Sequence, residues 1–291
     1  MIPINPGFVE LGNRLGKEKL FSYIDKFGFG KKTGIDLNGE ANGILFELDK
    51  IGPVELATTA FGQGVSVTPI QQITAVSAAI NGGILYKPYV VKSLNDPETN
   101  SIIEENKPIK VRRVISKEAS SEVRRALESV VTNGSGRNAY IQGYRVGGKT
   151  GTAQKVKDGR YMVGNYILSF IGFMPADEPK IVVYVAINNP KKVVQYGGVV
   201  SAPIARSILN DSISILNIEK RENDSEKKYN YNDKKYYTVE NVVGKTPKDA
   251  SIILSKFNVK YSGSGNFVID QSPSAGTKLK EDSIVRIMLG N

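Results

Sequence analysis

The chain has 291 residues, of which 40% are hydrophobic, so it is long enough for one large domain and one small domain. It contains no cysteine and no histidine, which excludes disulfides, thiolate nucleophiles, Ser-His-Asp catalysis and the usual zinc sites, so no metal or cofactor is expected. The net charge of +10 is spread among interleaved acidic residues without a nucleic-acid-binding motif, so nucleic acid is not an expected partner.

Two helices are predicted in the first 90 residues. The first covers residues 17–27, where apolar residues recur at helical spacing and Gly28 supplies a stop. The second begins after Thr68, an N-cap that is followed by proline at the first helical position, and it ends at Gly82. Its alanines predict a closely packed helix. Residues 31–45 form a glycine-rich connection between the two.

The next segment predicts a strand, a turn and a long helix. The strand covers residues 86–91, and the turn covers residues 96–100. The helix begins after Ser116, a good N-cap, and extends to Val131 with an apolar face. A polar, glycine-rich loop follows over residues 132–139.

A glycine-rich strand is predicted at residues 145–154, which read Arg-Val-Gly-Gly-Lys-Thr-Gly-Thr-Ala-Gln. Paired glycines weaken helices, and glycine in a strand lets another backbone or a ligand approach closely. On an edge strand, Lys149, Thr150 and Thr152 could line a slot for a peptide carboxylate, because the ammonium attracts the charge and the hydroxyls hydrogen-bond it. An Asp-Gly pair at residues 158–159 predicts a hairpin after this strand.

The Lys-Thr-Gly triplet occurs a second time, at Lys32-Thr33-Gly34, in a stretch that resembles a loop. The triplet alone is therefore weak evidence of a site. The copy at Lys149 follows a glycine pair and precedes a hairpin signal, whereas the copy at Lys32 has neither, and no catalytic role is assigned to it.

Two apolar strands and a helix complete the large domain. The strands cover residues 167–174 and 181–187 and form an antiparallel meander with the Lys149 strand. The helix covers residues 201–216, with Pro203 in its first turn. The apolar face that is expected to cover the sheet consists of Ile204, Ile208 and Ile213.

The last part of the chain predicts a linker and a small second unit. Residues 217–236 are rich in charged residues, Asn and Tyr and show no periodicity, which is typical of a linker. Residues 237–291 predict one helix, which begins after Thr246, and three strands. The strands are expected at residues 259–261, 267–271 and 283–289.

The motifs of the larger domain resemble those of one family. Gly-Lys-Thr-Gly-Thr-Ala-Gln at residues 148–154 resembles the third motif of class B penicillin-binding proteins, the D,D-transpeptidases that cross-link peptidoglycan. Phe-Gly-Gln-Gly at residues 61–64, before the Thr-Pro helix, is also similar to the family. Asn5 and the Phe-Val-Glu-Leu-Gly run at residues 8–12 match the tail of the family's Ser-x-Asn motif, with Pro3 at the position of its serine.

The second unit resembles a PASTA module, a small wall-associated domain. The resemblance is carried by Val-Val-Gly at residues 242–244, Gln-Ser-Pro at residues 271–273 and Ala-Gly-Thr at residues 275–277. The proline that usually precedes the valine pair is absent, and Asn241 stands there.

Together these resemblances imply an α+β fold. They imply a penicillin-binding transpeptidase-like domain, an antiparallel sheet with helices whose N-terminal part is missing, followed by a charged linker and an αβββ PASTA domain. The expected boundaries are residues 1–216, 217–236 and 237–291.

The resemblance also implies roles for five residues. Lys149 supplies positive potential, and the hydroxyls of Thr150 and Thr152, with Gly151 between them, hold the carboxylate of a substrate or β-lactam. The backbone N–H of Thr152 points at the oxyanion, and Asn5 orients the substrate amide.

Transpeptidation in this family requires a nucleophilic serine with a lysine three residues later, which a helix places on one face. The clear match, Ser225 to Lys228, lies in the charged linker, where nothing buries the lysine, and it is rejected. The Ser-x-Asn matches at residues 93–95 and 264–266 are rejected because neither precedes the family's helix. The nucleophile is therefore expected upstream of residue 1, and the chain alone is expected to be inactive.

The resemblance implies a peptidoglycan D,D-transpeptidase on the cell-wall side of the cytoplasmic membrane, outside the cytoplasm. Expected partners are stem peptides ending in D-Ala-D-Ala, β-lactams, wall polymer through the PASTA module, and division or sporulation proteins. The chain contains neither a run of about 18 apolar residues nor a signal peptide, so the anchor is expected to be missing. Two alternatives stay open: a non-catalytic wall-binding protein that uses PASTA, and a serine β-lactamase.

Overall fold

The computed structural model describes residues 5–157, 160–221, 236–281 and 283–291. The chain forms two compact units, Met1–Tyr229 and Asn230–Asn291, each with its own hydrophobic core. Pro3, the predicted Asp-Gly turn and the serine–lysine pair in the linker lie outside the described residues. Ile218, at the start of the predicted linker, is buried in the core of the first unit.

Local sequence signals set helix boundaries in the first unit. α4 (Pro69–Ile80) begins after Thr68, and reciprocal hydrogen bonds between Thr68 and Gln71 form a capping box. α5 (Lys117–Asn133) begins after Ser116, whose hydroxyl accepts a backbone N–H three residues later. Both starts agree with the prediction. The other helical elements before α6 are α1 (Asn5–Leu15), α2 (Lys17–Lys26), α3 (Pro53–Ala60) and the short 3₁₀ turns η1 (Leu48–Lys50) and η2 (Arg137–Ala139).

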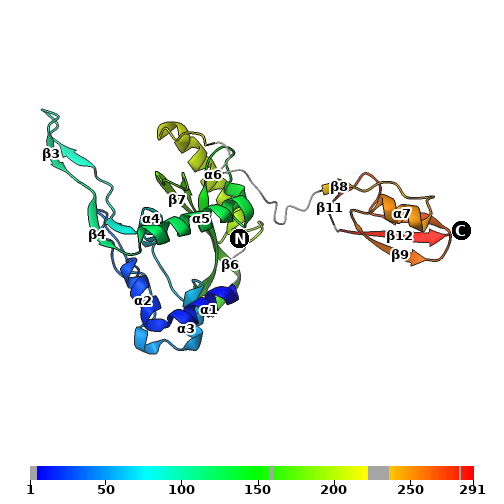
Figure 1. Ribbon diagram of the computed structural model, residues 1–291, viewed down its shortest axis with the longest axis horizontal. Coiled ribbons are helices and arrows are strands. Elements are labelled where there is room, and N and C mark those ends of the chain that lie inside the picture. Colours follow the sequence, from blue (N-terminus) through cyan, green and yellow to red (C-terminus); the bar gives the residue numbers. More distant parts are fainter. Residues whose placement is uncertain (1–4, 158–159, 222–235, 282) are drawn as a thin grey trace. The chain divides into compact units, whose positions relative to one another are not determined.

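A three-stranded antiparallel sheet lies beside α5 and α6 in the first unit (Figure 1). β5 (Gly147–Lys157), β6 (Arg160–Met174) and β7 (Ile181–Asn188) follow the order β5-β6-β7, so β5 is an edge strand, as predicted. On one face Phe170 packs with residues of α6 (Gly197–Ile215), and on the other Phe173 packs with residues of α4 and α5. The second half of β6 is thus buried between helices on both faces of the sheet.

α6 differs from its prediction in start and orientation. It begins at Gly197, four residues before the predicted start at residue 201, so Pro203 lies inside the helix. Ile204 and Ile208 are 43% and 42% exposed, so two of the three residues expected to cover the sheet do not. Two alanines and a leucine face the sheet instead, and they form one buried cluster with Phe170. The residues buried there are Ala202, Ala205 and Leu209, and Ile213 packs beside them.

The strand predicted over residues 86–91 is shorter than expected. β1 (Ile84–Lys87) ends where the next residue is a proline, which has no N–H for a strand ladder. The N–H groups of Val90 and Val91 donate instead to the two carboxylate oxygens of Asp36, each at 2.8 Å. These bonds tie the segment to the connection at residues 31–45, and they lower the pKa of Asp36.

A two-stranded arm extends from β1. β1 pairs with β4 (Ile109–Arg113), and β2 (Ser93–Asn95) pairs with β3 (Ile102–Glu105) beyond them. The turn predicted at residues 96–100 joins β2 to β3. Figure 1 shows this arm projecting away from β6 and β7.

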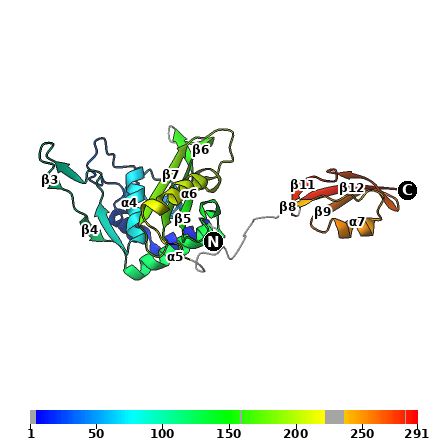
Figure 2. The same cartoon turned by 90° about the horizontal axis from the view of Figure 1, so that it is seen from above.

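The second unit contains the predicted helix and all three predicted strands. α7 (Pro247–Ile253) lies on one side of a sheet with the order β10-β12-β9 (Figure 2). A small pair, β8 with β11, was not predicted. The strands are β8 (Tyr236–Thr238), β9 (Asn258–Gly263), β10 (Phe267–Ser272), β11 (Lys278–Lys280) and β12 (Ile284–Gly290).

Candidate active site

The first half of β5 carries the Lys-Thr-Gly-Thr sequence. Lys149 is opposite Ile171 and Thr152 is opposite Leu168 in the antiparallel ladder with β6. The glycine pair before Lys149 is required by packing, because a Cβ on Gly147 or Gly148 would lie closer than 3.0 Å to the ring of Phe173 or Phe170. These close contacts fix β5 on the sheet while its other edge faces no strand in the described part of the chain.

Lys149 is partly buried at the strand. Its ammonium donates a hydrogen bond to the carbonyl oxygen of Thr150 at 2.7 Å. Burial lowers the pKa of Lys149 below the ordinary lysine value of 10.5, because desolvation disfavours the charged form. Among the described residues, the Lys149 ammonium has only this one hydrogen bond. An anion that bound nearby would therefore compensate the cost of its desolvation.

The two threonine hydroxyls have different partners. Side chains alternate along a strand, so Thr150 and Thr152 lie on the α6 face of the sheet and Lys149 on the other. Thr150 Oγ1 is 3.0 Å from Ser135 Oγ, which belongs to the polar loop at residues 132–139. Thr152 Oγ1 accepts a hydrogen bond from Gly197 N–H at 3.3 Å.

The N-terminus of α6 lies against these threonines. The N–H groups of a helix N-terminus carry partial positive charge, so α6 adds to the potential of Lys149 at Thr152. Helix and strand approach closely, because a Cβ on Gly197 would lie closer than 3.0 Å to the carbonyl oxygens of Ser169 and Gly151. Gly197 and Ser135 were not predicted from the sequence, although the glycine pair after Tyr196 was a signal for such an approach.

Asn5 is the first described residue of α1 and is exposed. α1 packs against α3, where a Cβ on Gly12 would meet the Cβ of Ala60 at 2.5 Å. Within the residues that the structure covers, no hydrogen bond joins Asn5 to β5. Its role as a substrate-orienting residue stays a prediction.

The second triplet already holds a carboxylate from its own chain. Glu40 accepts hydrogen bonds from Thr33 N–H at 2.5 Å, from the Thr33 hydroxyl at 2.6 Å and from Gly34 N–H at 3.0 Å. The donors of Thr33 and Gly34 are thus occupied, which agrees with giving this copy no catalytic role. The contact also illustrates the chemistry expected of the triplet at Lys149.

We expect the Glu40 contact to make stability depend on pH. Partial burial alone would raise the pKa of Glu40, but the hydrogen bonds from Thr33 and Gly34 outweigh it and lower the pKa below 4.5. The stabilisation is therefore complete above about pH 4.5 and is lost as the pH falls through the folded-state pKa. Glu40→Gln should reduce the loss of unfolding free energy between pH 5 and pH 3, measured by urea unfolding. Glu98→Gln, in the exposed turn, is the control, and an equal effect of both changes would contradict this prediction.

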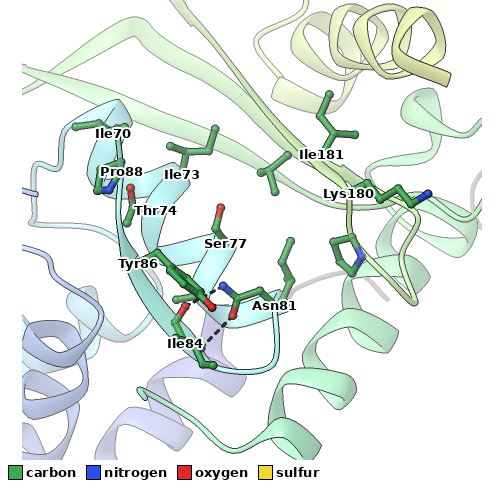
Figure 3. Close-up of a pocket in the computed structure, with 14 residues that line it drawn as sticks. Ile70, Ile73, Thr74, Ser77, Asn81, Ile84, Tyr86, Pro88, Lys180 and Ile181 are labelled. Carbon is green, nitrogen blue, oxygen red and sulfur yellow. Dashed lines mark hydrogen bonds between the residues drawn. The ribbon is translucent and has the colours of Figure 1, made fainter. Parts of the chain in front are cut away.

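A cavity of about 410 Å³ lies between α4, β1 and the start of β7 (Figure 3). Its walls are mostly apolar, with Ile70, Ile73 and Ile181 around it, and Asn81 is fixed by hydrogen bonds to the backbone of Ile84. None of the residues of the Lys149 motif lines it. The cavity is therefore separate from the candidate active site.

Within the described residues, no group of three or more Asp or Glu residues could hold a metal ion. The same residues include no helix long and apolar enough to cross a membrane.

Comparison with known proteins identifies the class to which the chain belongs. The model of the penicillin-binding protein transpeptidase domain matches residues 4–210, and the model of the PASTA domain matches residues 237–291. The chain therefore belongs to the penicillin-binding protein transpeptidase family and carries a PASTA domain. The predicted family and the predicted α+β fold are confirmed.

Individual relatives refine this placement. Stage V sporulation protein D of Bacillus subtilis is 60% identical over 285 residues, which cover 98% of this chain and 44% of that protein. Peptidoglycan D,D-transpeptidase FtsI of Escherichia coli is 35% identical and is matched over 74% of this chain and 35% of its own length. Penicillin binding protein 3 of Mycobacterium tuberculosis, solved in complex with ampicillin, has a TM-score of 0.69 and 29% identity, covering 76% of this chain and 50% of that one. The chain thus spans less than half the length of these curated relatives.

Proposed function

We propose that this chain is the substrate-carboxylate-binding part of a peptidoglycan D,D-transpeptidase that also binds β-lactams. The proposal is carried by β5, an edge strand with an ammonium on one face and, on the other, two hydroxyls beside the N-terminus of a helix. An edge strand can pair with an extended peptide, and the charged and hydroxyl groups can receive its terminal carboxylate. The Lys32 triplet supports this, because Thr33 and Gly34 of that triplet hold the carboxylate of Glu40 there.

Each residue of the motif then has a role in the reaction. Lys149 attracts the carboxylate of D-Ala-D-Ala or of a β-lactam, and Thr150 and Thr152 donate hydrogen bonds to it. Gly151 lets Ser169 of β6 lie close to the strand, because a Cβ there would lie closer than 3.0 Å to the Ser169 hydroxyl, and its lack of a side chain lets the substrate backbone approach. The backbone N–H of Thr152 stabilises the tetrahedral oxyanion, a contribution of about 3 kcal/mol for one such donor. Asn5 orients the substrate amide when the site is complete.

The acylating serine is proposed to lie outside these 291 residues. The one Ser-x-x-Lys match in the 291-residue sequence, Ser225 to Lys228, lies in the charged segment and outside the described residues. We therefore expect no covalent labelling of this chain by a fluorescent penicillin. Labelling at a serine, located by mass spectrometry, would show that the nucleophile is present.

The setting of the activity is proposed from the same family relationship. The PASTA domain, residues 237–291, would bind wall polymer, and this supports a position on the outer side of the cytoplasmic membrane. The 60% identical relative is a sporulation protein, which favours a role among sporulation proteins over one in division.

A wall-binding function without catalysis is the second candidate, and the PASTA match over residues 237–291 favours it. In that case, residues 237–291 bind muropeptides and changes in β5 have no effect on any activity. Sequencing upstream of residue 1 separates the two candidates, because an in-frame Ser-x-x-Lys helix supports the transpeptidase.

Lys149→Ala tests the proposed role of β5. We expect at least tenfold weaker binding of an acetylated peptide ending in D-Ala-D-Ala, followed by amide chemical shifts of residues 150–152. As the pH rises, binding to the wild-type chain should weaken at a lower pH than it would for a lysine with the ordinary pKa, because the lowered pKa of Lys149 means that its ammonium loses its proton sooner.

Lys157→Ala, at the exposed end of the same strand, removes the same charge and is the control. Equal effects of the two changes on peptide binding would refute the assignment, and urea unfolding checks that both variants fold.

A further inference from the structure

The partner of each threonine hydroxyl determines what that hydroxyl can still do. A hydroxyl has one hydrogen to donate and two lone pairs to accept with. Thr152 Oγ1 accepts from Gly197 N–H, so its own hydrogen can be donated to a ligand. Thr150 Oγ1 lies 3.0 Å from Ser135 Oγ, and either oxygen can be the donor in that pair. The direction of the Ser135–Thr150 bond thus decides whether Thr150 can donate outward.

Ser135 is held in place by contacts of its loop. Gly136 N–H donates to Val130 O at 3.0 Å, which closes the end of α5. Asn138 Nδ2 donates to Gly198 O at 2.7 Å, which attaches the loop to the first turn of α6. A Cβ on Gly198 would lie closer than 3.0 Å to the carbonyl oxygen of Ser135, so loop and helix are in close contact. Ser135 itself is exposed, so the hydroxyl pair is open to a ligand.

We propose that Ser135 is a positioning residue that makes Thr150 a donor to the substrate carboxylate. This rests on the proposed function of β5. A carboxylate can only accept, so Thr150 must donate to it, and Ser135 then donates to Thr150 Oγ1. Hydrogen bonds in such a chain polarise one another and strengthen the last one. Thr150 and Thr152 both become outward donors, one oriented by Ser135 and the other by Gly197.

The arrangement has a consequence for specificity. With Ser135 donating, the hydroxyls offer hydrogens to a ligand, and an ionised carboxylate accepts at both oxygens. A carboxamide accepts at one oxygen only and its nitrogen donates, so it leaves one outward hydroxyl unpaired. Without Ser135, the Thr150 hydroxyl can rotate to accept from the amide nitrogen. Removing Ser135 should therefore reduce the preference for carboxylate over carboxamide.

The test compares two peptides on the 291-residue chain. An acetylated tripeptide ending in D-Ala-D-Ala and its C-terminal amide are each titrated into the isotope-labelled protein, and the amide signals of residues 150–152 give the two dissociation constants. We expect Ser135→Ala to lower the ratio of carboxylate to amide affinity about three- to tenfold. Ser135→Thr, which keeps the hydroxyl, should retain the wild-type ratio. Ser101→Ala is the matched control, because it removes another exposed hydroxyl that lies 2.7 Å from a threonine hydroxyl, that of Thr99.

The outcomes separate this inference from the proposed function. If the wild-type chain does not prefer the carboxylate, the proposed function of β5 is wrong and the inference is overturned with it. If the wild-type chain prefers the carboxylate and Ser135→Ala keeps the ratio, the inference alone is overturned. The inference alone is also overturned if Ser135→Ala weakens both peptides equally together with thermal stability, because that is the signature of a purely structural residue.

Discussion

Replacing Arg145 by alanine should lower the free energy of unfolding of the first unit by about 3 kcal/mol. The Arg145 guanidinium makes a bidentate pair with Glu128, with Nε–Oε1 and Nη2–Oε2 distances of 2.8 and 2.7 Å. Glu128 is only 8% exposed, so the substitution leaves a buried carboxylate without its main partner. Arg145 also lies 3.4 Å from Asp177, which pairs in turn with Arg221. The substitution therefore disturbs a network that joins α5 to the start of β5.

Two comparisons make this prediction specific. Arg125→Ala removes an exposed pair with Glu122, whose side chains are 78% and 66% exposed, and should cost less than about 1 kcal/mol. The double change Arg145→Met with Glu128→Leu should recover most of the lost stability, because no charge is then left buried. Urea unfolding of the four proteins measures these differences. Equal losses for Arg145→Ala and Arg125→Ala would show that the pair contributes no more than a surface ion pair.

Gly197→Ala should damage both stability and binding. The added Cβ would lie closer than 3.0 Å to two backbone oxygens, those of Ser169 and Gly151, and backbone cannot rotate away as a side chain can. We expect α6 to shift away from β5, at a cost of about 1–3 kcal/mol. The shift also removes the N–H that Thr152 Oγ1 accepts, so the peptide ending in D-Ala-D-Ala should bind more weakly.

Gly7→Ala is the matched control for this change. Gly7 lies in α1, and nothing is within 4 Å of the Cβ that it would gain. Alanine there should leave stability unchanged or raise it by up to about 1 kcal/mol, because glycine weakens a helix interior. If Gly197→Ala unfolds at the wild-type urea concentration and binds peptide normally, the close approach of α6 to β5 is wrong.

The features that could be predicted are those that depend on neighbours in sequence. The starts of α4 and α5 follow from Thr68 and Ser116, because a cap acts within one helical turn. The β5-β6-β7 meander follows from glycine placement and apolar runs separated by a turn. The family followed from the residues around Lys149, since the triplet occurs twice and only its flanks differ.

The features that were missed depend on contacts between distant segments. The start of α6 is set by Gly197 approaching Ser169 and Gly151, which no local propensity reveals. Helical spacing alone does not show which face of α6 is turned to the sheet. In the structure Ala202, Ala205 and Leu209 pack with Phe170, and Ile204 and Ile208 are exposed. Ser135 lies 15 residues before Thr150, and only the folded loop brings the two hydroxyls together.

The carboxylate of Glu40 shows what a free ligand lacks at β5. Glu40 is tethered seven residues from Thr33, so its effective concentration at those donors is at least millimolar. A ligand that arrives from solution loses translational and rotational freedom instead, at a cost of about 4 kcal/mol or more. Three hydrogen bonds to a small anion do not offset that cost in water. Acetate should therefore not compete at Lys149, and binding there requires a ligand long enough to extend along the strand.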